Sequence, residues 1–212
     1  MNQNLQFEIF HSATQKAVNI NPAVWMDYEA ISRVIPHPET SINREELRSL
    51  ARSAFNGNSA LLLDLFVKTM MWGSGTTNGR GPRYTNKALV EGNPHDVLID
   101  MHRYMQSSDI ESAYYLYRRL PGVGPSFHTK LLWVVGSTFS ELNPRPLILD
   151  ELVWLGLKEI QWNSVKASGS VRRGARYVAY LNECKLLSEN YSCDPEDIEF
   201  SLFTWGKRIK GS

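Results

Sequence analysis

The sequence predicts an all-α fold, arranged as two helical lobes with a cleft between them. Apolar side chains recur at helical spacing along most of the 212 residues, and alternation of period two is confined to the first ten. Glycine and proline interrupt the helical pattern at short intervals, so the helices should be short and closely connected. Hydrophobic residues make up 42 % of the chain, which is enough to build a core.

The first half of the chain shows helix starts and stops that can be read from single residues. Residues 43–55 form a helical pattern capped by Ser41 or Asn43, with acidic residues in the first turn and a stop at Asn56 and Gly57. Residues 59–72 form a strongly apolar helix that should lie in the core. A glycine-rich loop from Gly73 to Pro82 follows; it carries Arg80, and Arg83 comes directly after it.

The second half continues the same pattern. Asp109 caps a helix, Pro125 occupies a first helical position, and Asp194 with Pro195 begins a last helix that runs toward Arg208. The other predicted helices cover residues 85–91, 94–105, 126–135, 150–158 and 171–189.

Composition excludes several classes of protein. The net charge is only +1, so no strong overall field points to a nucleic-acid partner, although a local basic patch can suffice. Cys184 and Cys193 lack metal-ligand spacing, and no cofactor is expected. The sequence shows no apolar run long enough for a membrane span and no signal-peptide pattern, so we expect a cytoplasmic protein.

A tight corner, Leu-Pro-Gly-Val-Gly at residues 120–124, joins two helical patterns. Gly122 and Gly124 lack a Cβ atom, so their N–H groups can lie bare next to the N-terminus of the following helix, where the dipole is positive. Such a corner can bind a phosphodiester oxygen without reading a base. The alternative is a plain hairpin of two helices that binds nothing.

The corner resembles the hairpin of the helix-hairpin-helix DNA glycosylase superfamily, and the chain is most similar to its compact bacterial 8-oxoguanine DNA glycosylase-like members. In that superfamily an aspartate begins a helix shortly after the hairpin, and Asp150 stands at the matching place, 26 residues after Gly124. The resemblance implies one domain over residues 1–212, the hairpin motif at about 109–136, and the aspartate loop and helix at 146–158. It also implies an active cleft between two lobes.

The resemblance further implies roles for individual residues of the corner. Phosphate contacts fall on Leu120, Gly122, Val123, Gly124 and Ser126, with a monovalent cation at the hairpin carbonyls as a further option. Double-stranded DNA is the expected partner of a monomeric enzyme.

Asp150 fits the chemistry of base excision. Breaking an N-glycosidic bond builds positive charge on the sugar, and a nearby carboxylate stabilises that charge and can orient water. The apolar residues 147–149 before it would strengthen its field. The alternative is an ordinary capping aspartate, and one residue can serve both purposes.

The identity of the nucleophile is open. Family members that also cut the DNA backbone carry a lysine two residues after the second glycine, where this chain has Ser126, so the resemblance implies hydrolysis by water. Lys130 lies one helical turn further on the same face and could serve as a lyase nucleophile, or it could point into solvent. Leu152 replaces a frequent family histidine, and the loop before Asp150 is longer than usual.

Base recognition requires aromatic and polar groups in a pocket. The candidates are Trp72, His128, Phe203 and Trp205, of which His128 and the tryptophans could equally belong to the core. Four basic clusters could contact DNA: Arg80, Arg83 and Lys87; Arg118 and Arg119; Arg172, Arg173 and Arg176; and Lys207, Arg208 and Lys210. Two further alternatives remain: a glycosylase for another base, such as a hypermodified base of foreign DNA, and a DNA-binding module without catalysis.

Overall fold

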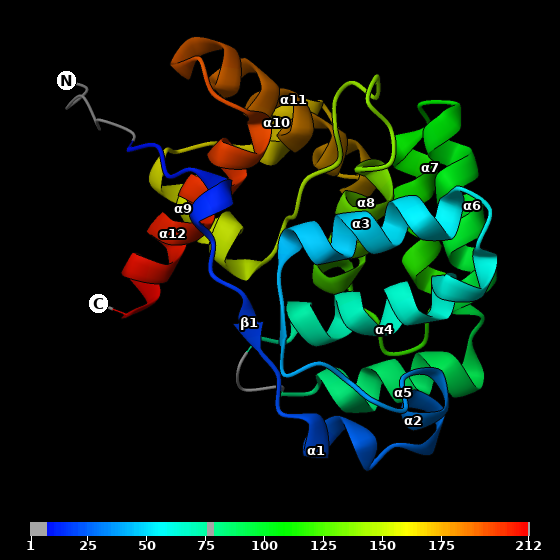
Figure 1. Cartoon of the computed structure of the whole chain (residues 1–212). Coiled ribbons are helices and arrows are strands. Elements are labelled where there is room, and N and C mark those ends of the chain that lie inside the picture. Colours follow the sequence, from blue (N-terminus) through cyan, green and yellow to red (C-terminus); the bar gives the residue numbers. More distant parts are fainter. Residues whose placement is uncertain (1–7, 76–78, 212) are drawn as a thin grey trace.

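The computed structural model describes residues 8–75 and 79–211 and confirms an all-α fold. The described part of the chain contains twelve α-helices, three short 3-10 helices and one two-stranded sheet. Figure 1 shows how these elements are arranged. The helices are α1 (Pro22–Met26), α2 (Glu29–Val34), α3 (Arg44–Phe55), α4 (Leu62–Gly73), α5 (Gly81–Glu91), α6 (Pro94–Gln106), α7 (Ile110–Tyr115), α8 (Pro125–Gly136), α9 (Glu151–Glu159), α10 (Ser164–Ser168), α11 (Arg173–Tyr191) and α12 (Pro195–Gly211). Within these ranges no helix is both long and apolar enough to cross a membrane.

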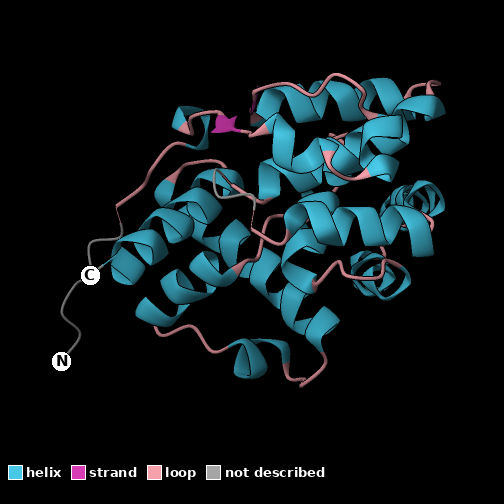
Figure 2. Cartoon of the chain, turned by 90° about the horizontal axis from the view of Figure 1, so that it is seen from below, coloured by secondary structure: helices cyan, strands magenta, loops and turns pink. Residues whose placement is uncertain are grey.

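The helices pack in two groups. Helices α9 to α12 pack on one another at the upper left of Figure 1, while α3 to α6 and α8 form a layered bundle at the right. Helix α7 contacts both α8 and α11, and it therefore joins the two groups. The view from below in Figure 2 shows that helices make up most of the chain and that loops connect them.

Local capping explains why the helices begin where they do. Asn43 accepts a hydrogen bond from the Glu46 amide at 2.9 Å, and the Glu46 carboxylate accepts one from the Asn43 amide at 2.7 Å, which completes a capping box. Asp109 accepts from Ser112 at 3.0 Å and begins α7. These contacts confirm the two starts predicted from the sequence.

Several elements differ from the sequence-based expectation. Helices α1, α2 and α10 are five to six residues long, too short to show a clear apolar period. Helix α5 begins at Gly81, four residues before the predicted start, because Pro82 fits the first turn of a helix. Strands β1 (Val18–Asn19) and β2 (Ser41–Ile42) pair antiparallel, and they are too short to alternate visibly.

Two expectations fall partly on residues that the structure leaves out. The loop predicted from Gly73 to Pro82 includes residues 76–78, which lie outside the described residues. The alternation in the first ten residues rests mostly on residues 1–7, which lie outside them too.

Helices α4 and α8 form the centre of the core. Trp133 on α8 is fully buried, and Trp72 at the end of α4 stacks on it with a ring separation of 5.4 Å. His128 on α8 is also fully buried, and its Nε2 atom lies 2.9 Å from the Ala113 carbonyl oxygen. Burial lowers the pKa of His128 to about 4, so this ring is neutral at pH 7.

Candidate active site

The corner at residues 120–124 is held by its own hydrogen bond. The Val123 amide donates to the Leu120 carbonyl at 3.0 Å, and the side chains of both residues are buried. The Val123 amide is therefore occupied within the corner. Among the described residues, neither the Gly122 amide nor the Gly124 amide donates to another protein group.

The two glycines of the corner differ in backbone conformation and in the space around them. Gly122 has φ of +85°, a conformation that favours glycine, and a Cβ atom there would lie 3.2 Å from Tyr84, which is a tight contact. Gly124 has an extended backbone, and a Cβ atom would meet nothing within 4 Å. The space beside Gly124, at the N-terminus of α8, is therefore open to a ligand.

Asp150 caps α9 and faces a lysine. Its Oδ1 atom accepts hydrogen bonds from the Leu152 and Val153 amides at 3.0 and 3.1 Å. Its Oδ2 atom lies 3.2 Å from the Nζ atom of Lys130, and the carboxyl side chain is 15 % exposed. The capping role and a chemical role are compatible here, because one oxygen serves the helix and the other faces the lysine.

The electrostatic surroundings keep Asp150 ionised. Burial by itself raises the pKa of a carboxyl group, but the Lys130 charge and the two amide hydrogen bonds more than offset it, so the pKa of Asp150 lies below its ordinary value. The result is a carboxylate that is largely removed from water and still charged at neutral pH.

The backbone before Asp150 is fixed by buried hydrogen bonds. The Tyr177 and Tyr180 hydroxyls of α11 donate to the Leu147 and Ile148 carbonyls, each at 2.7 Å. The Leu149 amide donates to the Thr129 hydroxyl of α8 at 3.0 Å. Residues 147–149 are themselves buried, so this segment forms the apolar support that the sequence predicts. Helices α8 and α11 thus hold the carboxylate in place from two sides.

Lys130 is directed into the protein, which excludes its solvent-facing alternative. Its side chain is only 10 % exposed, and its stem crosses the end of α4 at Gly73. A Cβ atom at Gly73 would lie 2.6 Å from Lys130 Cδ, so glycine at this position gives the lysine its path. Ser126, one turn earlier on α8, lines a cavity beside Asp150 that Lys130 does not line.

A cavity of about 260 Å³ lies between the two helical groups, and we call it the Asp150 cavity. Its walls come from α3, α4, α8, α9 and α12. Among its lining residues are Trp72, Lys130, Asp150, Leu152, Glu199 and Phe203. The structure therefore brings together Asp150, Lys130 and two of the four predicted aromatic or histidine pocket residues.

The other two predicted pocket residues are elsewhere. His128 faces the core and Ala113, and it does not line the Asp150 cavity. Trp205 packs against the hydrophobic core from α12 and does not line the Asp150 cavity. Trp205 lies two residues after Phe203, and at the helical period this spacing places it on a different face of α12.

Two residues that the sequence analysis missed form the polar end of the cavity. Arg44 donates to Glu199 at 2.9 and 3.2 Å, and its guanidinium lies over the Trp133 ring at 4.9 Å. Glu199 is 1 % exposed. Burial raises the pKa of Glu199 to about 7, against the opposing charge of Arg44. Glu196 extends the network by accepting from both Arg44 and Arg48.

Carboxylates neutralise part of the four predicted basic clusters. Arg119 pairs with Asp100, Arg172 with Glu111, Arg208 with Glu8 and Lys210 with Glu151. Arg173 and Arg176 instead line the second cavity beside Asp150. In the described ranges, no group of three His, Cys, Asp or Glu side chains could hold a metal ion.

A comparison with protein-family models gives one match that covers most of the chain. The model described as "Putative 8-oxoguanine DNA glycosylase OGG-like protein" matches residues 11–203. No curated protein and no solved structure matches the chain. The matched range contains the corner, Asp150, Lys130 and every residue that lines the Asp150 cavity.

Proposed function

The chain belongs to the 8-oxoguanine DNA glycosylase OGG-like family, and we therefore propose that it is a DNA N-glycosylase. Its substrate would be an oxidised purine such as 8-oxoguanine in double-stranded DNA. The observation that carries the proposal is the position of Asp150, a nearly buried and ionised carboxylate at the rim of a cavity large enough for one nucleobase.

Binding begins with the strand that carries the damaged base. A phosphate of that strand docks at the open amide of Gly124 and the N-terminus of α8. The damaged base leaves the stack and enters the Asp150 cavity, where Trp72 and Phe203 offer aromatic surfaces. The unstacking cost is offset by these contacts and by the phosphate contacts.

Excision then follows from the charge of Asp150. As the bond between C1′ and the base nitrogen breaks, its electron pair leaves with the base, which takes up a proton. The Asp150 carboxylate stabilises the positive charge that develops on the deoxyribose. A water molecule forms the new bond to C1′ and gives up a proton to Asp150, which returns it to solvent. The products are the free base and an abasic strand.

A second candidate function is a glycosylase that also cuts the DNA backbone, and the distance between Lys130 and Asp150 favours it. Lys130 Nζ lies 3.2 Å from Asp150, so an amine nucleophile is within reach of the same sugar. Ser126 stands at the position where lyase members of the superfamily carry their lysine, which argues for hydrolysis. We therefore keep water as the nucleophile.

Borohydride reduction during the reaction separates the two candidates. We expect the wild-type protein to release the base and to leave no covalent adduct with DNA, because serine occupies the usual lyase position and Lys130 is held in an ion pair with Asp150. A trapped adduct that disappears in Lys130→Gln and persists in Lys166→Gln, a change of an exposed lysine, would instead establish the lyase.

The proposal as a whole is tested by duplexes that each carry one defined lesion. We expect mass spectrometry to detect free 8-oxoguanine after incubation with the wild-type protein, and no release from the undamaged duplex. Release of a different base alone would reassign the substrate. Tight binding of the duplexes without release of any base would favour a DNA-binding module over an enzyme.

A further inference from the structure

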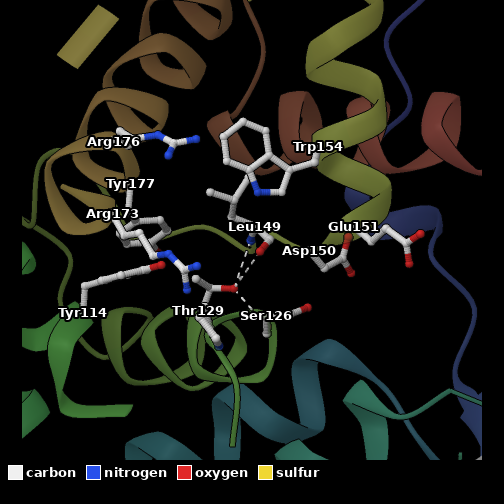
Figure 3. Close-up of a pocket in the computed structure, with 11 residues that line it drawn as sticks. Tyr114, Ser126, Thr129, Leu149, Asp150, Glu151, Trp154, Arg173, Arg176 and Tyr177 are labelled. Atoms are coloured by element: carbon white, nitrogen blue, oxygen red, sulfur yellow. Dashed lines mark hydrogen bonds between the residues drawn. The ribbon is translucent and has the colours of Figure 1, made fainter. Parts of the chain in front are cut away.

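A second cavity, of about 350 Å³, lies on another side of Asp150, and we call it the arginine cavity. Figure 3 shows Arg173 and Arg176 reaching into it from α11, opposite Thr129 of α8 and Trp154 of α9. Asp150 is the one residue among the described ranges that lines both this cavity and the Asp150 cavity. The carboxylate therefore stands at the junction of two binding spaces.

Within residues 8–75 and 79–211, no carboxylate forms an ion pair with the two arginines of the arginine cavity. Among the described residues, neither Arg173 nor Arg176 has a carboxylate oxygen within 4.0 Å. Arg176 donates through Nε to the Ser164 hydroxyl at 2.8 Å and lies over the Trp154 ring at 5.6 Å, so its terminal nitrogens remain available. The two acidic residues of the lining are already paired, Asp150 with Lys130 and Glu151 with Lys210.

The neighbouring Arg172, which lies outside the cavity, is paired with a carboxylate, in contrast to the two arginines that line the cavity. Arg172 pairs with Glu111 at 2.7 Å, and it does not line the arginine cavity. Three arginines within five residues of one helix start thus divide into one that is neutralised and two that face the space beside Asp150.

The position of the cavity indicates what it would bind. Its floor includes Pro125 and Ser126, which directly follow the open amide of Gly124. A DNA strand docked at that amide and placing its sugar at Asp150 must pass this floor. Guanidinium groups bind phosphate oxygens through paired, charge-assisted hydrogen bonds.

We propose, on the basis of the proposed glycosylase function, that the arginine cavity binds the backbone phosphate adjacent to the extruded nucleotide. Arg173 and Arg176 are then positioning residues. They hold the phosphate on one side of Asp150 while the base occupies the Asp150 cavity on the other. The deoxyribose between these two anchors is thereby fixed next to the carboxylate.

Binding measurements on a duplex with one tetrahydrofuran abasic site test this site without requiring excision. We expect Arg173→Gln and Arg176→Gln each to weaken binding roughly tenfold, and to reduce the slope of log K against log salt by about one unit. Arg172→Gln removes the same charge from a residue outside the cavity, and we expect a change of less than about twofold. Thermal unfolding of each variant verifies that it is folded.

Single neutral methylphosphonates placed at each phosphate around the abasic site identify the partner. At one phosphate next to the abasic site, we expect the methylphosphonate to weaken DNA binding by the wild-type protein. The same methylphosphonate should have little further effect on DNA binding by Arg173→Gln. The proposal is overturned if a methylphosphonate at every position weakens DNA binding by the wild-type protein and by Arg173→Gln equally. It is also overturned if Arg172→Gln and Arg173→Gln lose the same amount of DNA affinity. Base excision by a protein that fails this test would leave the glycosylase function standing without the phosphate site.

Discussion

Asp150→Asn is expected to lower the rate of base excision by about a thousandfold or more while DNA binding persists. The variant keeps the shape of the side chain, and asparagine caps helices as well as aspartate does, so α9 still begins at residue 151. It loses the negative charge that stabilises the developing positive charge on the sugar. Single-turnover release of 8-oxoguanine gives the rate, and titration with an abasic-site duplex gives the affinity.

Asp109 provides a matched control for this variant. Asp109 also caps a helix, accepting from Ser112 at 3.0 Å, but it is exposed and lines neither cavity. Asp109→Asn should therefore release the base at a rate close to that of the wild-type protein. A base-excision rate for Asp150→Asn within about tenfold of the wild-type rate would contradict the proposal. It would mean that the carboxylate only caps α9 and takes no part in excision.

Gly206→Ala is expected to destabilise the fold by roughly 3 kcal/mol. Helices α9 and α12 approach closely here, since a Cβ atom at Gly206 would lie 1.9 Å from the Leu152 carbonyl oxygen. Alanine improves helix propensity by about 1 kcal/mol, so the collision must outweigh that gain. Leu152 lies two residues after Asp150, and a displaced α12 should therefore disturb the site as well. Urea unfolding measures the free energy.

Gly211→Ala on the same helix is the control for Gly206→Ala. A Cβ atom at Gly211 would meet nothing within 4 Å, so this change should leave the free energy of unfolding almost unchanged. Equal stability of Gly206→Ala and Gly211→Ala would show that α9 and α12 can separate without cost. The tight packing of the two helices would then have no part in fixing Asp150.

Local features of the sequence predict much of this architecture. Side-chain caps such as Asn43 and Asp109 leave a signal within three or four residues, and the corner is recognisable as a short string. These features depend only on neighbours in sequence, and a single chain is therefore sufficient to find them.

Contacts between distant segments leave no such signal. Arg44 and Glu199 are separated by 155 residues, and each alone reads as an ordinary surface charge. The burial of His128 depends on where α7 packs, which the helical period of α8 does not specify. The glycines at 156 and 206 indicate close packing, but only the structure shows that they face each other's helices.

A crystal structure of Asp150→Asn bound to a duplex with one 8-oxoguanine tests the central claim most directly. We expect the base in the Asp150 cavity near Trp72 and Phe203, its C1′ atom beside residue 150, and a phosphate at the Gly124 amide. A damaged base still stacked within the duplex, or DNA bound away from the corner at residues 120–124, would contradict the account.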